Sequence, residues 1–192
     1  MLWKLTAVLA FSLAWLPASA VRADDNPECC NYNGFYIGVG GAFAKELFDK
    51  GDTDSGAEVN ARVGYRFLDF LAVEAFGGYE PHFNGNSGQY TSADVSIWEG
   101  FGNLKVYPLA RWTGWVQPYA LAGLGYMWAD TKGGVLANNV NDNGPSGRFG
   151  GGIDMFLTEH VFFTIDGAYL NPWNDASEFD QWLIGGALQY RF

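Results

Sequence analysis

The chain is poor in the residues and segments that several protein classes depend on. Its 192 residues include 2 cysteines, 2 histidines and 11 lysines and arginines, against 21 aspartates and glutamates. The net charge of −10 makes nucleic acid a poor partner. No stretch offers the roughly 18 uninterrupted apolar residues that a transmembrane helix needs. Membrane strands stay possible, because a strand crosses a bilayer with only about 9–11 residues.

The two cysteines, Cys29 and Cys30, are adjacent. Adjacent Cα atoms lie about 3.8 Å apart, below the usual range for a disulfide, so a bond between these cysteines would be strained. We interpret the pair as a dithiol in a tail or as an occasional intermolecular bridge, with a redox or metal role as the alternative. The metal role lacks ligands, because two sulfurs without histidine or further cysteine do not complete a typical site.

The first residues have the features of an export signal. Lys4 supplies one positive charge, a largely apolar run follows it, and the run is followed by Ala18-Ser19-Ala20. This order is typical of a secretory signal peptide, so we expect residues 1–20 to be removed by cleavage after Ala20, or alternatively after Ala23. We expect residues 21–33 to form a periplasmic tail, because they are polar and show no periodicity.

Glycine and aromatic residues are abundant. The chain has 26 glycines, and 17% of its residues are aromatic, which suits strands with tight turns and aromatic residues at membrane interfaces. From Gly34 onward, apolar side chains alternate with polar or small ones, which is the period of a strand. Eight segments show this alternation: residues 34–44, 57–67, 71–79, 95–107, 115–128, 148–157, 161–170 and 181–192. In the fifth segment the alternation is weak and Pro118 indicates an edge-like end or a bulge, so its facing stays open.

The last segment carries the clearest membrane signal. One of its faces is apolar and aromatic, and is made by Trp182, Ile184, Gly186, Leu188, Tyr190 and Phe192. A bilayer would cover this face, and backbone groups in hydrocarbon must all be paired, so the last strand must close a barrel onto the first. A terminal Phe with an aromatic residue two places before it resembles the carboxy-terminal signature of bacterial outer-membrane barrels. That resemblance implies that Tyr190 and Phe192 are read by the barrel assembly machinery.

The connections between the eight segments alternate in length. Four are long, at residues 45–56, 80–94, 129–147 and 171–180, and three are shorter, at residues 68–70, 108–114 and 158–160. Outer-membrane barrels have short periplasmic turns and longer outer loops. Residues 34–192 therefore predict an all-β fold, an eight-stranded antiparallel up-and-down transmembrane β-barrel with both ends in the periplasm. The match resembles the family of outer membrane protein A and the opacity proteins, and we expect a monomer.

Ten ionisable residues fall on the polar side of the alternation and should face the lumen. They balance in sign, and they are Glu58, Arg62, Arg66, Glu74, Glu99, Lys105, Arg148, Asp154, Asp166 and Arg191. The interior of an eight-stranded barrel is just wide enough to be filled by side chains, and an isolated buried charge would cost several kcal/mol. We therefore expect an ion-pair network that plugs the lumen. The alternatives are a narrow ion path opened by rearranging pairs, and catalysis within the lumen.

The remaining motifs are weak. Gly38-Val39-Gly40-Gly41 lies in a predicted strand and lacks the helix and the acidic partner of a dinucleotide site. We place His82 in an outer loop and His160 in a periplasmic turn, which separates the two histidines. Three serines near His82 match no motif of the deacylases and proteases on related barrels; they are Ser87, Ser92 and Ser96. Residues of the first and third predicted loops are similar to calcium-binding loops but lack the terminal glutamate. These residues are Asp49, Asp52, Asp54, Asn139, Asn141, Asn143 and Gly144. We therefore expect solvated loops, with adventitious binding of divalent ions as the alternative.

Together these features predict a small non-enzymatic protein of the bacterial outer membrane that contributes to envelope integrity, to surface interaction through its outer loops, or to both. The alternatives are a narrow porin-like channel and an outer-membrane lipid-modifying enzyme. We expect no cofactor. The expected partners are outer-membrane lipid and lipopolysaccharide, the assembly machinery and a surface ligand. Because the sequence ends at Phe192, we expect no attached peptidoglycan-binding domain.

Overall fold

The described part of the protein consists of strands and their connections. A computed structural model describes residues 32–46, 55–85, 93–110, 114–132, 141–173 and 180–192. The strands are β1 (Gly34–Glu46), β2 (Ser55–Leu68), β3 (Leu71–Gly85), β4 (Ala93–Val106), β5 (Val116–Lys132), β6 (Asn141–Phe156), β7 (Val161–Pro172) and β8 (Gln181–Arg191). Within these ranges there is no helix that is long and apolar enough to cross a membrane.

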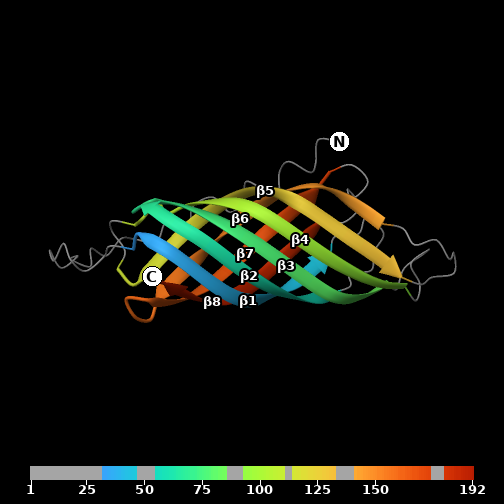
Figure 1. Cartoon of the computed structure of the whole chain (residues 1–192), viewed down its shortest axis with the longest axis horizontal. Helices are drawn as coiled ribbons and strands as arrows, with labels where there is room; N and C mark the ends of the chain where they lie inside the picture. Colours follow the sequence, from blue (N-terminus) through green and yellow to red (C-terminus); the bar gives the residue numbers. More distant parts are fainter. Residues whose placement is uncertain (1–31, 47–54, 86–92, 111–113, 133–140, 174–179) are drawn as a thin grey trace, which may run out of the picture.

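The eight strands form one closed barrel, as the sequence predicted. Each strand pairs antiparallel with the next in sequence, and β8 pairs with β1. Figure 1 shows the strands wrapping obliquely around the long axis. The backbone N–H of Phe192 donates to the carbonyl of Phe35 at 2.9 Å, so the barrel begins and ends on the same side. We call that side the inner end and the opposite side the outer end, after the predicted periplasmic and surface orientation.

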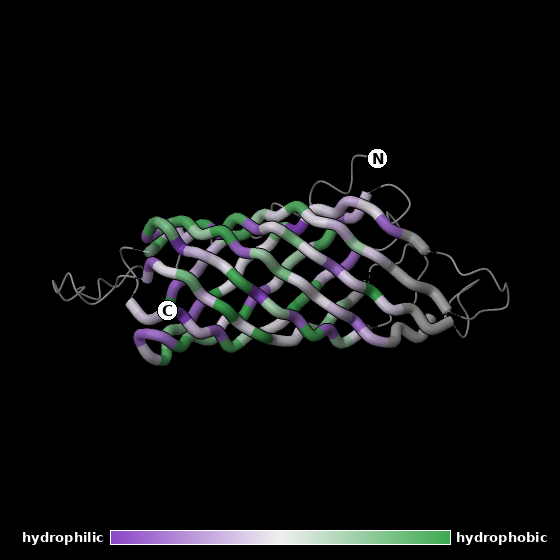
Figure 2. The backbone as a smooth tube through the Cα atoms, in the orientation of Figure 1, coloured by the Kyte–Doolittle hydropathy of each residue, from purple (hydrophilic) through white to green (hydrophobic). Residues whose placement is uncertain are grey.

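Side chains alternate between a lipid-type outer surface and the lumen. Phe35, Ile37 and Val39 are half to two-thirds exposed, whereas Tyr36 between them is buried. Figure 2 shows apolar and polar positions alternating along the strands. The outward face predicted for the last strand is confirmed, because Trp182, Ile184, Leu188, Tyr190 and Phe192 are all exposed. Because the barrel is closed, each strand has a pairing partner on both sides, which strands need in order to cross hydrocarbon.

The structure determines the facing of β5, which the sequence left open. Gln117, Tyr119, Leu121 and Met127 are buried, so the odd-numbered residues point into the lumen. Pro118 pairs with Ile153 of β6, whereas the pairing of β5 with β4 begins only at Ala120. The proline therefore occupies a place where β5 has one neighbouring strand, in agreement with the predicted edge-like end.

Several strands extend further toward the outer end than their apolar alternation predicted. The third predicted strand ended at Tyr79, but β3 continues to Gly85, and the sixth was expected to begin at Arg148, but β6 begins at Asn141. Backbone pairing continues there as far as Asp130 opposite Asn141. Apolar alternation is needed only where a strand meets hydrocarbon, so polar extensions escape a pattern based on hydropathy.

These extensions also correct two of the expectations about connections. His82 was placed in an outer loop, and it lies within β3. The expected rhythm of long and short connections weakens, since the inner β4–β5 connection at residues 107–115 is now longer than the outer one at residues 86–92. His160 does lie in the short inner connection between β6 and β7, as predicted.

Candidate functional site

The lumen is the part of the barrel where chemistry-bearing side chains gather. Of the ten residues predicted to line it, nine are buried and Arg191 lies partly exposed at the inner rim. Their strands place them by the same inward parity that buries Tyr36. The described pairs of opposite charge join five of the ten: Arg62, Glu74, Lys105, Arg148 and Asp166.

Asp166 of β7 is the centre of the first ion cluster. Arg62 of β2 donates two hydrogen bonds to it, from Nη1 to Oδ2 at 2.7 Å and from Nη2 to Oδ1 at 3.1 Å. This is the bidentate geometry in which guanidinium and carboxylate bind most strongly. Arg148 Nη2 lies 3.7 Å from the same Oδ2. Because the three residues come from β2, β6 and β7, the cluster ties distant strands together across the lumen.

The second ion cluster joins β3 to β4. Lys105 Nζ lies 2.5 Å from Glu74 Oε2, and both side chains are fully buried. The hydroxyl of Tyr36 on β1 donates to the same carboxylate oxygen at 3.1 Å. Lys105 Nζ also lies 4.5 Å from the ring centroid of Tyr119, within the range of a cation–π contact. Glu74 is therefore compensated by a full charge and a hydroxyl donor.

Asp154 of β6 has hydroxyl groups as its described donors. The Tyr107 hydroxyl donates to Oδ2 at 2.8 Å, and the Thr164 hydroxyl donates to Oδ1 at 2.6 Å. Gln189 Nε2 in turn donates to Thr164 at 2.5 Å. The sequence predicted pairing of charges across strands, and here two neutral donors satisfy a buried carboxylate instead.

An aromatic ring lies near both arginines of the first cluster. The guanidinium carbon of Arg148 lies 3.7 Å from the ring centroid of Phe76, and that of Arg62 lies 5.3 Å from it. Phe101 of β4 packs beside Phe76 with the ring centroids 6.4 Å apart. The ionisable pattern missed these rings, although Phe76 shares the inward parity of Glu74. The signal was present in the sequence, because Phe76 and Phe101 stand on the polar side of the alternation in their strands, and side chains on that side must fit inside the lumen.

Three carboxylates gather in the outer half of the lumen, and one of them was missed. Glu80 is buried, but the expected end of the third strand at Tyr79 had assigned it to a loop. Glu58 and Glu99 both approach Gly78, since the point that a Cβ on Gly78 would occupy is 2.9 Å from Glu99 Oε1 and 3.0 Å from Glu58 Cδ. Asn60 donates to Glu58 at 2.8 Å, whereas neither oxygen of Glu99 has a hydrogen-bond partner among the described residues.

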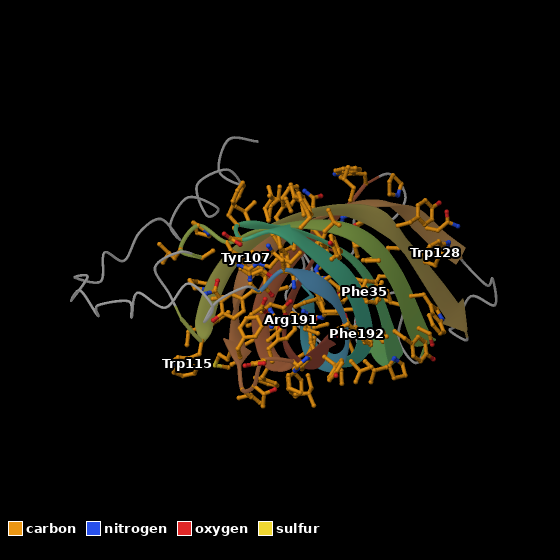
Figure 3. The ribbon with its side chains drawn as sticks, turned by 60° about the vertical axis from the view of Figure 1, so that its left-hand side comes forward. Phe35, Tyr107, Trp115, Trp128, Arg191 and Phe192 are labelled. Atoms are coloured by element: carbon orange, nitrogen blue, oxygen red, sulfur yellow. The ribbon has the colours of Figure 1, made fainter. Side chains whose placement is uncertain are left out.

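The two predicted assembly-signal residues lie on the outer surface at the closing seam of the barrel. Tyr190 and Phe192 pack edge to face with ring centroids 5.1 Å apart, and Phe192 lies 5.8 Å from Phe35 of β1. Figure 3 shows Phe35 and Phe192 close together. This arrangement leaves both rings exposed, but the structure describes no partner that reads them.

Aromatic pairs also mark the other end of the outer surface. The rings of Tyr79 and Trp98 pack against each other with centroids 4.2 Å apart, and those of Tyr126 and Trp128 lie 4.8 Å apart on the next strand. Figure 3 places Trp128 far from Trp115, which lies at the inner end. Aromatic residues near both ends of an apolar surface are typical of membrane interfaces, where a ring can meet hydrocarbon and water together.

The described residues contain no group of three or more histidine, cysteine, aspartate or glutamate side chains that could hold a metal ion. The ring of His160 stacks on Tyr190 at 5.8 Å. Asn141, Asn143 and Gly144, expected in the third loop, belong to β6. Eight further candidates for metal, redox or catalytic roles lie outside the described residues. They are Cys29, Cys30, Asp49, Asp52, Asp54, Ser87, Ser92 and Asn139.

Comparison with known proteins agrees with this geometry. Residues 6–192 match the outer membrane protein beta-barrel domain family. The chain belongs to this family. As an outer membrane protein barrel it has the fold and membrane that the sequence predicted, and the resemblance to outer-membrane barrels is confirmed. No curated protein matches the chain by sequence.

Solved barrels resemble the chain in fold. Neisserial surface protein A is 16% identical, with 83% of this chain and 97% of that one covered and a TM-score of 0.67. Ail, the attachment invasion locus protein of Yersinia pestis, is 17% identical, with 82% and 99% covered and a TM-score of 0.55. OprG from Pseudomonas aeruginosa is 16% identical, with 83% and 97% covered and a TM-score of 0.53. At these identities the likeness shows the fold alone.

Proposed function

We propose that this outer-membrane barrel is a non-enzymatic protein that supports the envelope and interacts at the cell surface, with a lumen sealed by its own side chains. The single observation that carries the proposal is the first ion cluster, where Arg62 and Arg148 share Asp166 and both lie near the ring of Phe76. A lumen bridged from β2 to β7 in this way leaves interaction to the outer surface and the outer connections. The ten predicted residues act as a structural plug in this proposal.

The charge of the chain indicates which surface partners suit it. The structure of Ail with sucrose octasulfate shows that protein in complex with a heparin analogue. The present chain carries a net charge of −10, and its first and fourth outer connections contain acidic residues, namely Asp49, Asp52, Asp54, Asp175, Glu178 and Asp180. Like charges repel a polyanion, so we propose a neutral or cationic surface ligand for this protein.

Complementation of a strain that lacks the protein tests the two roles separately. The wild-type chain is expected to restore both detergent resistance and binding of the cell surface to its partner. A variant with Gly-Ser replacements of residues 47–54 and 174–179, in the two acidic connections, should assemble in the outer membrane and restore detergent resistance, but should lose surface binding. Unchanged surface binding by this variant would contradict the role of the outer connections.

Narrow conduction is the second candidate function. The observation that favours it is the outer group of carboxylates, because Glu80 and Glu99 have oxygens without a described hydrogen-bond partner and such groups attract cations. Planar-bilayer recordings of the purified protein distinguish the two proposals. A sealed lumen predicts no discrete current steps in the wild type, and regular cation-selective steps would favour the channel.

A further inference from the structure

Two residues ahead of β1 lie across the inner mouth of the barrel. The Tyr32 hydroxyl donates to the carbonyl of Gly114 at 2.7 Å, and Asn33 Nδ2 donates to Asp69 Oδ1 at 3.4 Å. Gly114 precedes β5, which stands four strands away from β1 in the closed order β1 to β8. The bond from Tyr32 therefore spans the mouth from one wall to the opposite one, and Asn33 holds the same segment to the β2–β3 turn.

The Tyr32 ring fills an aromatic and cationic socket in that mouth. Its centroid lies 4.2 Å from that of Phe156 at the end of β6, and Phe156 stacks on Phe162 of β7 at 4.9 Å. The guanidinium carbons of Arg66 and Arg191 lie 5.4 and 5.7 Å from the Tyr32 ring centroid. Aromatic stacking and cation–π contacts from β2, β6 and β8 thus hold one ring in place.

The groups next to this socket are fixed by the barrel itself. Arg66 donates to the carbonyl of Asp69 and, at 3.2 Å, to Gln117 Oε1, and its guanidinium carbon lies 3.9 Å from the ring centroid of Tyr107. Arg191 donates to the carbonyl of Glu159. Figure 3 turns this end of the barrel toward the viewer, with Tyr107 and Arg191 labelled. The socket is built from strand ends and turns, so Tyr32 enters a preformed site.

We propose that the segment before β1 is an intramolecular stopper, in which Tyr32 closes the inner mouth and leaves the lumen open to entry only from the outer end. The closure is separate from the seal at Asp166, because it uses none of the residues of that cluster. It also assigns a role to the last residues of the predicted tail at 21–33. The tail is thereby attached to the centre of the mouth and not only to the rim.

Chemical access to a residue just inside the stopper tests the proposal. Gln189 of β8 is buried and faces the lumen two residues before Arg191. We would place Gln189→Cys in a chain with Cys29→Ser and Cys30→Ser, and measure its rate of modification by a small anionic methanethiosulfonate reagent in detergent. Tyr32→Ala should raise the rate roughly tenfold or more, since one hydrogen bond and ring contacts together shift an opening equilibrium by about that factor.

Three controls make the result specific. Tyr32→Phe keeps the ring and loses the bond to Gly114, so its rate should lie between those of the wild type and Tyr32→Ala. Thr158→Cys, in the exposed inner turn, should react at the same rate with either residue at position 32. The mobility of unheated protein on gels shows that each barrel is folded. Equal modification rates of Gln189→Cys with Tyr32 and with Tyr32→Ala, whether fast or slow, would overturn the stopper, and this outcome leaves the surface-binding assay untouched.

Discussion

In the inner half of the lumen the carboxylates Glu74, Asp154 and Asp166 each receive a cation or hydroxyl donors at 3.1 Å or less. In the outer half, Glu80 and Glu99 have oxygens without a described donor, and the neighbouring walls are apolar. The carboxylates of the inner half therefore all have close donors, and such paired groups favour one arrangement of the strands. The outer half brings carboxyl groups together with fewer described donors.

The strongest way to break this contrast is to remove the carboxylate at the centre of the inner half. Asp166→Ala leaves Arg62 and Arg148 buried without their shared partner, so we expect the free energy of unfolding to fall by about 3–5 kcal/mol. Urea unfolding of the protein in lipid vesicles, followed by tryptophan fluorescence, measures the change. Glu159→Ala is the matched control, because that carboxylate is exposed in a turn and its loss should change stability by less than about 0.5 kcal/mol. Equal effects of the two changes would refute the central role of Asp166.

A smaller effect is expected from removing one neutral donor. Thr164→Val keeps the shape of the side chain but removes the hydroxyl that donates to Asp154 at 2.6 Å. We expect the free energy of unfolding to fall by about 2 kcal/mol, because a buried carboxylate loses one of its donors. The same urea titration measures it, with Thr164→Ser as the control that keeps the hydroxyl. A result in which the serine variant is as unstable as the valine variant would assign the effect to packing.

The sequence predicted those features of the lumen that depend on local alternation, and it did not predict those that depend on the geometry of the whole barrel. Alternation predicted which residues of β2, β3 and β4 face inward, because the period of a strand is local. The choice of Asp166 as the partner of Arg62 depends on the register and shear of a closed barrel, which sum over many strands and leave no local pattern. Glu80 escaped because the polar end of β3 lies beyond the apolar alternation. The binding of Tyr32 in the mouth depends on turns that are far apart in sequence.

The last test exchanges one carboxyl group for an amide in each half of the lumen and compares the signs of the resulting changes in the free energy of unfolding. Glu99→Gln replaces a carboxyl whose oxygens have no described hydrogen-bond partner and supplies an N–H₂ group beside Glu58, so we expect the free energy of unfolding to rise by up to about 1 kcal/mol. Glu74→Gln makes the same change where a cation lies 2.5 Å away, and leaving Lys105 buried and unpaired should lower it by about 3 kcal/mol. Urea titrations of both variants at neutral pH measure the two values. Changes of opposite sign in the free energy of unfolding would mean that the carboxyl groups have matching donors in the inner half and are crowded in the outer half. A loss of stability in Glu99→Gln as large as that in Glu74→Gln would show that the outer carboxyl groups are as well compensated as the inner ones.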